Sequence, residues 1–167
     1  MTVYHGAVQE IREPELSYSR HNLDFGAGFY VTTLQEQAEK WAMRKSVAQG
    51  ALAIVNMYDF DVTDLNILTF DGYTEEWLDF VLLNRIGGQA KSIHDAVFGN
   101  IADDDVAATV DEYIRLTSKG RIEPQDKQFF IRQLRFSKPN NQYCISSPKG
   151  IEALTFLSSY EVGRRPI

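Results

Sequence analysis

Phe25-Gly26-Ala27-Gly28-Phe29-Tyr30-Val31-Thr32 is the stretch of the sequence that decides the fold. Its two glycines permit a tight turn, and the aromatic and β-branched residues after them predict a strand over residues 29–32. Thr33 is then expected to be the N-cap of a helix, with Glu36 three residues later completing a capping box. Apolar residues at helical spacing predict that this helix covers residues 34–48 and buries one stripe, formed by Leu34, Ala38, Trp41 and Ala42.

The same glycine turn does not fit a dinucleotide-binding fingerprint of the Rossmann type. A third glycine is missing, and the turn leads into a strand, whereas the fingerprint joins a strand to a helix. Glycine at Gly26 and Gly28 is expected instead to make a tight turn or to let the backbone approach a ligand.

The rest of the chain mixes strands and helices without strict alternation. Residues 51–60 are apolar on both alternations, which indicates a strand covered on both faces. Further strands are predicted at residues 3–5, 65–70, 96–98, 142–145 and 155–162, and further helices at 73–85, 106–118, 124–134 and 148–154. This mixture favours an α+β fold. Because no repeat or flexible linker divides the chain, residues 1–167 are expected to form a single domain.

Length and composition indicate a globular protein with its own hydrophobic core. The 167 residues are 44% hydrophobic, and the single cysteine, Cys144, is interpreted as a core residue in a reducing compartment. No export signal or long apolar run is visible, so a cytoplasmic location without membrane contact is expected. A net charge of -6 argues against broad nucleic-acid binding, and the basic residues between Arg115 and Lys138 are interpreted as a solvated face.

Neither a metal site nor a hydrolytic triad is predicted. His5, His21 and His94 lack the spacing of metal ligands. The run Asp103-Asp104-Asp105 is interpreted as the cap of the helix at 106–118, where acids favour the positive end of the helix dipole. The motif Gly-x-Ser-x-Gly is absent, and no catalytic signature flanks Cys144.

Three short fragments, taken in their order along the chain, are more informative than these isolated residues. They are Tyr4-His5-Gly6, residues 25–32 quoted above, and Asn140-Asn141-Gln142-Tyr143 at the start of a late strand. This order resembles the ADP-ribosyltransferase superfamily, in the diphtheria-toxin and poly-ADP-ribose-polymerase branch with its His-Tyr-Glu triad. The resemblance implies a split β-sheet core with flanking helices.

The chain is also similar, over nearly its whole length, to an uncharacterised bacterial family catalogued as a domain of unknown function. The shared motifs are Tyr-His-Gly, Phe-Gly-x-Gly-Phe-Tyr, a central segment at residues 95–104 and a late Asn-Asn-Gln. Each motif is short, but their order and spacing together are specific.

The resemblance implies a role in NAD binding for six residues. His5 would hydrogen-bond a ribose hydroxyl, and the Gly6 backbone would pair with the nicotinamide carboxamide. Tyr30 would stack on the cationic nicotinamide ring. Gln142 would hold the nicotinamide-ribose hydroxyl, and Thr32 and Thr33 would line the pocket.

Gln142 departs from the superfamily pattern, which has a glutamate at this position. A carboxylate about 4 Å from the developing positive charge contributes up to roughly 4 kcal/mol at an effective dielectric near 20, or about three decades of rate. An amide keeps the hydrogen bond and loses most of that contribution. Gln142 therefore predicts slow transfer, a supporting carboxylate from Asp103 or Asp104 of the shared central segment, or no catalysis. It also favours transfer of single ADP-ribose units over polymer synthesis.

Three functions follow from these residues. The leading hypothesis is an NAD-dependent mono-ADP-ribosyltransferase that modifies a macromolecule, protein or nucleic acid, as a bacterial toxin or effector with an antitoxin partner. The second is a catalytically silent NAD-binding or interaction module, which the missing carboxylate favours. The third is an NAD glycohydrolase, which uses water as the acceptor.

Overall fold

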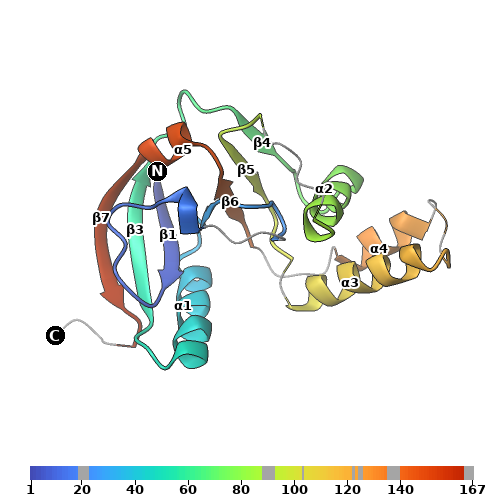
Figure 1. The fold of residues 1–167 in the computed structure, drawn as a ribbon, viewed down its shortest axis with the longest axis horizontal. Coiled ribbons are helices and arrows are strands. Elements are labelled where there is room, and N and C mark those ends of the chain that lie inside the picture. The colour runs from blue at the N-terminus through green and yellow to red at the C-terminus, as the bar shows by residue number, and fades with distance from the viewer. Residues whose placement is uncertain are drawn as a thin grey trace.

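The computed structural model describes residues 1–18, 23–87, 93–102, 104–121, 123, 126–134 and 140–163. It is an α+β fold with two sheets, as the mixed pattern of the sequence predicts (Figure 1). In chain order its elements are β1 (Thr2–Ala7), a 3-10 turn (Leu16–Tyr18), β2 (Phe29–Val31), α1 (Gln35–Gln49), β3 (Ile54–Phe60), β4 (Ile67–Thr69), α2 (Glu75–Arg85), β5 (Ala96–Gly99), α3 (Asp104–Ser118), α4 (Lys127–Leu134), β6 (Gln142–Ile145), α5 (Pro148–Glu152) and β7 (Leu154–Glu161).

The two sheets meet at one backbone bridge. The first has strand order β1-β3-β7 and is antiparallel, and the second has order β2-β6-β5-β4, with β4 and β5 parallel. Tyr4 of β1 and Thr32, just after β2, form an isolated antiparallel bridge with N–H···O distances of 2.8 and 3.0 Å. The strands β1 and β2 separate beyond this bridge, so the two sheets diverge from it.

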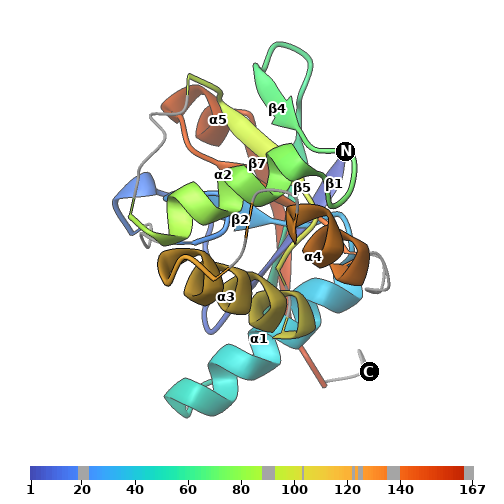
Figure 2. The same cartoon turned by 90° about the vertical axis from the view of Figure 1, so that its right-hand side faces the viewer.

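Three apolar clusters lie between successive layers. Ala38 and Ala42 of α1 pack on Val55 of the first sheet. Between the sheets, a second cluster includes Val3 and Phe60 from one side and Phe29 and Ile145 from the other, among the residues Val3, Phe29, Val31, Tyr58, Phe60, Ala96 and Ile145. The largest cluster joins the outer face of the second sheet to α2, α3 and α4, which cover that face in Figure 2.

The predicted elements are present, with corrections at their ends. The capping box at Thr33 is wrong: the N-cap is Leu34, without a side-chain cap bond, because the Thr33 hydroxyl accepts from Asn141 Nδ2 instead. Trp41, predicted in the buried stripe, is 42% exposed, since small side chains alone fit where α1 crosses β1. Helix α2 begins after its true cap, Thr74, whose hydroxyl accepts from the N–H of Trp77.

Strand β6 has the predicted bounds, Gln142–Ile145, and the other boundaries shift by at most three residues. Strand β3 begins at Ile54 and β4 is confined to Ile67–Thr69, whereas β5 extends to Gly99. Helix α4 begins at Lys127, and the predicted start at Pro124 lies outside the described residues. Within the described part of the chain, no helix is long and apolar enough to cross a membrane.

Gly6 fixes how closely α1 approaches β1. A Cβ at this position would lie 2.2 Å from the carbonyl oxygen of Ala38 and 2.7 Å from the nitrogen of Ala42, both helix backbone atoms. Gly6→Ala is therefore expected to push α1 off the sheet and lower the free energy of unfolding by about 3 kcal/mol, measured by urea denaturation.

The matched control is Gly50→Ala at the C-terminus of the same helix. Gly50 has a φ of 62° and nothing within 4 Å of its Cβ position, so the loss there reflects backbone strain alone, about 1 kcal/mol. Equal losses for the two variants would contradict the close packing at Gly6.

Candidate functional site

His5 lies where β1 leaves β2, and its hydrogen bonding fixes the tautomer of the ring. Nδ1 is 2.6 Å from the carbonyl oxygen of Tyr30. A carbonyl only accepts, so Nδ1 carries the proton and Nε2 presents a lone pair. Burial, opposed by the bond to Tyr30 and reinforced by the nearby Lys45 ammonium, lowers the pKa of His5 to about 4. At neutral pH His5 is therefore a neutral hydrogen-bond acceptor at Nε2.

Where β1 and β2 are no longer paired, side chains form hydrogen bonds to the backbone carbonyls of these strands. After the Tyr4–Thr32 bridge, the next antiparallel pair would be Gly6 with Tyr30, but the ladder ends at the bridge. The carbonyl of Tyr30 is bonded to His5, and the carbonyl of Gly6 accepts from Lys45 Nζ at 2.6 Å. We call this junction of Gly6, His5, Tyr30 and Lys45 the sheet junction.

The turn at residues 25–28 is explained by packing. The Tyr30 hydroxyl donates to the carbonyl of Gly26 at 2.6 Å and accepts from the N–H of Phe25 at 3.2 Å. Gly28 lets the chain close onto β6, since a Cβ there would lie 2.5 Å from Cys144 Sγ. Burial raises the pKa of the Tyr30 phenol, which is thereby kept protonated. Tyr30 is therefore held by its own turn and is not a base.

Asn141 connects β2, α1 and β6 through five hydrogen bonds. Its Oδ1 accepts from the Thr32 hydroxyl and the Thr33 N–H, both at 3.0 Å, and its Nδ2 donates to the Thr33 hydroxyl at 2.8 Å. Its backbone exchanges bonds with the Gln37 amide, at 2.6 and 3.2 Å. The hydroxyls of Thr32 and Thr33, predicted to line a pocket, are thus engaged in holding the strand that begins with Gln142.

Asn140 performs the same task on the other side of β6. Its Oδ1 accepts from the N–H of Ile101 at 2.8 Å, and its Nδ2 donates to the Tyr73 hydroxyl at 3.0 Å. The two asparagines therefore anchor the start of β6 to both of its neighbours. Of the Asn-Asn-Gln motif, the side chain that remains for other work is that of Gln142.

Gln142 is buried without full hydrogen bonding. It opens β6 opposite Gly99, and it lies one position beyond the Val31–Tyr143 pair, which puts it across from Thr32. The residue is 9% exposed, and its Nε2 is a buried donor with no hydrogen-bond partner. Leaving such a donor unsatisfied costs about 1–3 kcal/mol. A buried amide without a partner beside the sheet junction marks a candidate ligand-binding position.

The predicted site residues are brought together only in part. Alternation along β2 and β6 puts the side chains of Tyr30 and Gln142 on the same face, toward α2, α3 and α4. The His5 ring stacks on Phe29 at 4.4 Å, toward the first sheet, and meets Tyr30 through its backbone. No hydrogen bond or ring contact between described residues joins His5 to Gln142.

The structure does not describe the side chains of Asp103 and Asp104, the carboxylates predicted to support Gln142. Asp103 lies outside the described residues, and Asp104 is placed only as the first residue of α3. His21, one of the three histidines, also lies outside them.

In the described part of the chain, no three acidic, histidine or cysteine side chains are close enough to hold a metal ion. A surface hollow of about 580 Å³ lies along α1, lined by Glu36, Glu39, Lys40, Met43, Arg44 and Val162, none of them a predicted site residue.

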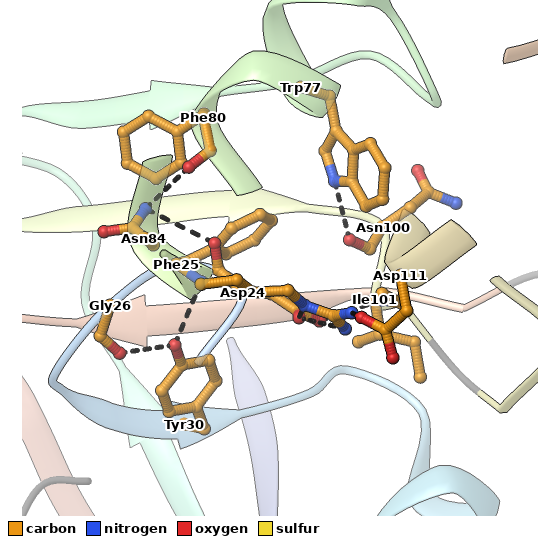
Figure 3. A network of polar contacts seen from close by, with 12 residues as sticks. Asp24, Phe25, Gly26, Tyr30, Trp77, Phe80, Asn84, Asn100, Ile101 and Asp111 are labelled. Carbon is orange, nitrogen blue, oxygen red and sulfur yellow. Dashed lines mark hydrogen bonds and ion pairs between the residues drawn. The ribbon is translucent and has the colours of Figure 1, made fainter. Parts of the chain in front are cut away.

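Sequence reasoning missed an ion-pair network around Asp24, the residue that precedes the turn at 25–28 (Figure 3). Arg85 donates to Asp24 Oδ1 through Nε at 3.0 Å and Nη2 at 2.8 Å, and to Asp111 at 2.9 Å. The second oxygen of Asp24 accepts from the N–H of Ala102, and Asn84 donates to the Asp24 carbonyl. Asp24 and Arg85 are 61 residues apart, and no local pattern in the sequence pairs them.

The fold and site together define an α+β protein with two sheets that part at a polar junction and a buried amide beside it. The chain belongs to the family described as "Protein of unknown function (DUF3990)", whose model matches residues 1–156. The expected membership in a family of unknown function is confirmed. No curated protein and no solved structure matches the chain.

The neutrality of His5 is testable by its titration. The unfolded chain binds a proton at His5 near the ordinary pKa of 6.5 and the folded chain only at about 4, so protonation favours unfolding between these pH values. The contribution of neutral His5 to the free energy of unfolding is expected to be fully present above pH 6.5 and to be lost as the pH falls toward 4. His5→Asn, whose amide still donates to Tyr30, should lack this loss. NMR of the imidazole should give a midpoint of about 4; a midpoint near 6.5 would show a solvated ring.

Gln142→Leu tests the unsatisfied amide. Replacing an unpaired buried donor by an apolar side chain of similar size is expected to raise the free energy of unfolding by about 1 kcal/mol, or Tm by about 2–4 °C for a chain of this size. Asn141→Leu, which breaks fully formed bonds next door, should lower Tm. A loss of stability in Gln142→Leu as large as that in Asn141→Leu would mean that Gln142 is a structural residue.

Proposed function

We propose that this protein binds NAD at the sheet junction and transfers single ADP-ribose units to a macromolecule. The observation that carries the proposal is the buried, unpartnered Nε2 of Gln142 at the start of β6. The motif resemblance to the ADP-ribosyltransferase superfamily supplies the ligand, because Gln142 stands where that superfamily holds the nicotinamide ribose. The divergence of two sheets from a single bridge is compatible with the split-sheet core that this resemblance implies.

His5 has the protonation state that a ribose contact requires. A ribose hydroxyl donates its proton most readily to an unprotonated nitrogen, and the bond to Tyr30 leaves Nε2 as that nitrogen. The pKa of about 4 keeps it unprotonated throughout the physiological range. His5 would therefore orient a hydroxyl and would not act as a general acid at neutral pH.

Gln142 would orient the nicotinamide ribose through its amide. A ribose hydroxyl can accept from Nε2, which would satisfy the buried donor. Because an amide carries no charge, it offers little stabilisation to the cation that develops as nicotinamide departs. The proposed reaction is therefore slow unless another carboxylate contributes.

Tyr30 and Gly6 complete the proposed site in different ways. The partly buried Tyr30 ring is fixed at its hydroxyl end and packs against the largest apolar cluster, and in the proposal the exposed part of the ring contacts nicotinamide. Gly6 is explained by the approach of α1, so its contribution to binding would come from its backbone groups and not from the missing side chain. A role as a bacterial toxin or effector, with an antitoxin partner, rests on family resemblance alone.

A catalytically silent NAD-binding module is the second candidate. It is favoured by the charges at the junction, where His5 is bonded to the neutral Tyr30 carbonyl and the charge that acts on it is that of the Lys45 ammonium. Such a site would bind the dinucleotide without assisting cleavage. An NAD glycohydrolase would share the site and use water as the acceptor.

Labelled NAD separates these candidates. The protein is incubated with NAD labelled in the adenylate half and with bacterial extract, and released nicotinamide and label on protein and nucleic acid are measured. Transfer predicts both signals, glycohydrolysis predicts nicotinamide alone, and silent binding predicts neither, with a Tm that still rises with NAD concentration. Absence of all three signals would refute NAD as the ligand.

Gln142→Glu is expected to increase the rate of nicotinamide release. A carboxylate at this position would stabilise the developing cation and raise the rate by about one to three decades, measured at pH 8, where the carboxyl is ionised. Gln142→Leu is the matched control and should abolish release. Equal rates in wild type, Gln142→Glu and Gln142→Leu would place Gln142 outside the reaction site.

A further inference from the structure

Lys45 is held against β1 by the same helix stripe that packs on Gly6. Ala38 and Ala42 are buried on this stripe, and Lys45 follows at the spacing of one further turn. Its Nζ donates to the carbonyl oxygen of Gly6 at 2.6 Å in a partly buried position. This contact brings an ammonium group to the sheet junction.

The backbone of Lys45 is fixed relative to β1, but its ammonium group can move. Helix α1 lies in direct backbone contact with Gly6, because a Cβ there would lie 2.2 Å from the Ala38 oxygen. The Lys45 Cα is therefore fixed relative to β1. The flexible four-carbon stem still allows the ammonium to swing to another partner within its reach.

The Gly6 carbonyl points to the side on which a ligand would bind. Tyr4 directs its backbone N–H and C=O toward Thr32, away from β3. Backbone groups two residues apart on a strand point the same way, so Gly6 also directs its N–H and C=O away from β3, into the space where β1 and β2 part. In the proposed function these groups pair with the carboxamide of nicotinamide, and the Lys45 ammonium now occupies the carbonyl.

The two possible ligands, a free carboxamide ring and the intact dinucleotide, differ in the groups that they offer to the Lys45 ammonium. A free carboxamide ring is neutral and offers the ammonium at most an oxygen no stronger than the Gly6 carbonyl, so the displacement of Lys45 gains nothing for this charge. The intact dinucleotide brings a diphosphate, which is a stronger partner for an ammonium than a neutral carbonyl is. Its nicotinamide ring is also cationic, so an ammonium that stayed at the Gly6 carbonyl would repel it.

We propose that Lys45 is a specificity-determining residue, which makes the site accept a carboxamide ring only when a diphosphate arrives with it. Its ammonium bonds the Gly6 carbonyl until the dinucleotide binds and then transfers to the diphosphate. This inference rests on the proposed function. It follows that released nicotinamide competes poorly for the site while ADP-ribose is retained.

Lys45→Met tests this with three probes: NAD, ADP-ribose and 3-aminobenzamide, a carboxamide ring without phosphate. Binding constants are measured by calorimetry for wild type, Lys45→Met and Lys45→Arg, which keeps the positive charge. In Lys45→Met, 3-aminobenzamide should bind about tenfold more tightly, because no ammonium competes for the carbonyl, and ADP-ribose about tenfold more weakly. Lys45→Arg should keep the wild-type order of affinities.

The outcomes separate the inference from the proposed function. If NAD and ADP-ribose bind but 3-aminobenzamide gains nothing in Lys45→Met, or if all probes shift in the same direction, the role of Lys45 is refuted and NAD binding stands. If no probe binds any of the three proteins, the proposed function fails and the role of Lys45 with it.

A measurement without ligand checks the premise. Removing the ammonium in Lys45→Met should raise the pKa of His5 above its value of about 4, because Lys45 lowers it electrostatically. An unchanged His5 titration in a folded Lys45→Met protein would show that the ammonium is not at the sheet junction, and the inference would be overturned.

Discussion

Two hydrogen bonds between Tyr4 and Thr32 are the constraint on which the rest of the structure depends. They join two sheets that otherwise diverge, and divergence leaves backbone groups of Gly6 and Tyr30 without strand partners. Buried backbone groups must be satisfied, so side chains replace the missing ladder: His5 at one carbonyl and Lys45 at the other. A polar junction between apolar layers is the direct consequence of ending the ladder after one bridge.

This arrangement divides the recognisable motifs into residues that build the junction and residues that are available to a ligand. Gly26, Gly28 and the Tyr30 hydroxyl shape the turn, and Asn140 and Asn141 secure the start of β6. Among the described residues, Nε2 of Gln142 is buried without a hydrogen-bond partner, and Nε2 of His5 presents a lone pair. In the proposed function, a ribose hydroxyl would donate to the acceptor of His5 or accept from the donor of Gln142.

The electrostatics of the junction favour binding of an anion over stabilisation of a cation. His5 is neutral, Gln142 is neutral, and the Lys45 ammonium acts electrostatically on His5. In the supporting network, the Asp24 carboxylate is paired with Arg85. A dinucleotide carries its negative charge on the diphosphate and its positive charge on nicotinamide, so this junction suits the first group better than the second. If the protein acts as proposed, the same feature predicts a slow reaction.

The sequence by itself determined the element order, the α+β class, the family and the strand that Gln142 opens, because hydrophobic periodicity and turn residues act locally. It misjudged the cap of α1, since the Thr33 hydroxyl is used by Asn141, 108 residues away. Tertiary structure alone decided that Gly6 serves helix packing, that Asp24 pairs with Arg85, that Lys45 reaches the Gly6 carbonyl and that the Gln142 amide is left without a partner. Each of these features depends on contacts between segments that are far apart in the sequence, and the local spacing of residues does not specify such contacts.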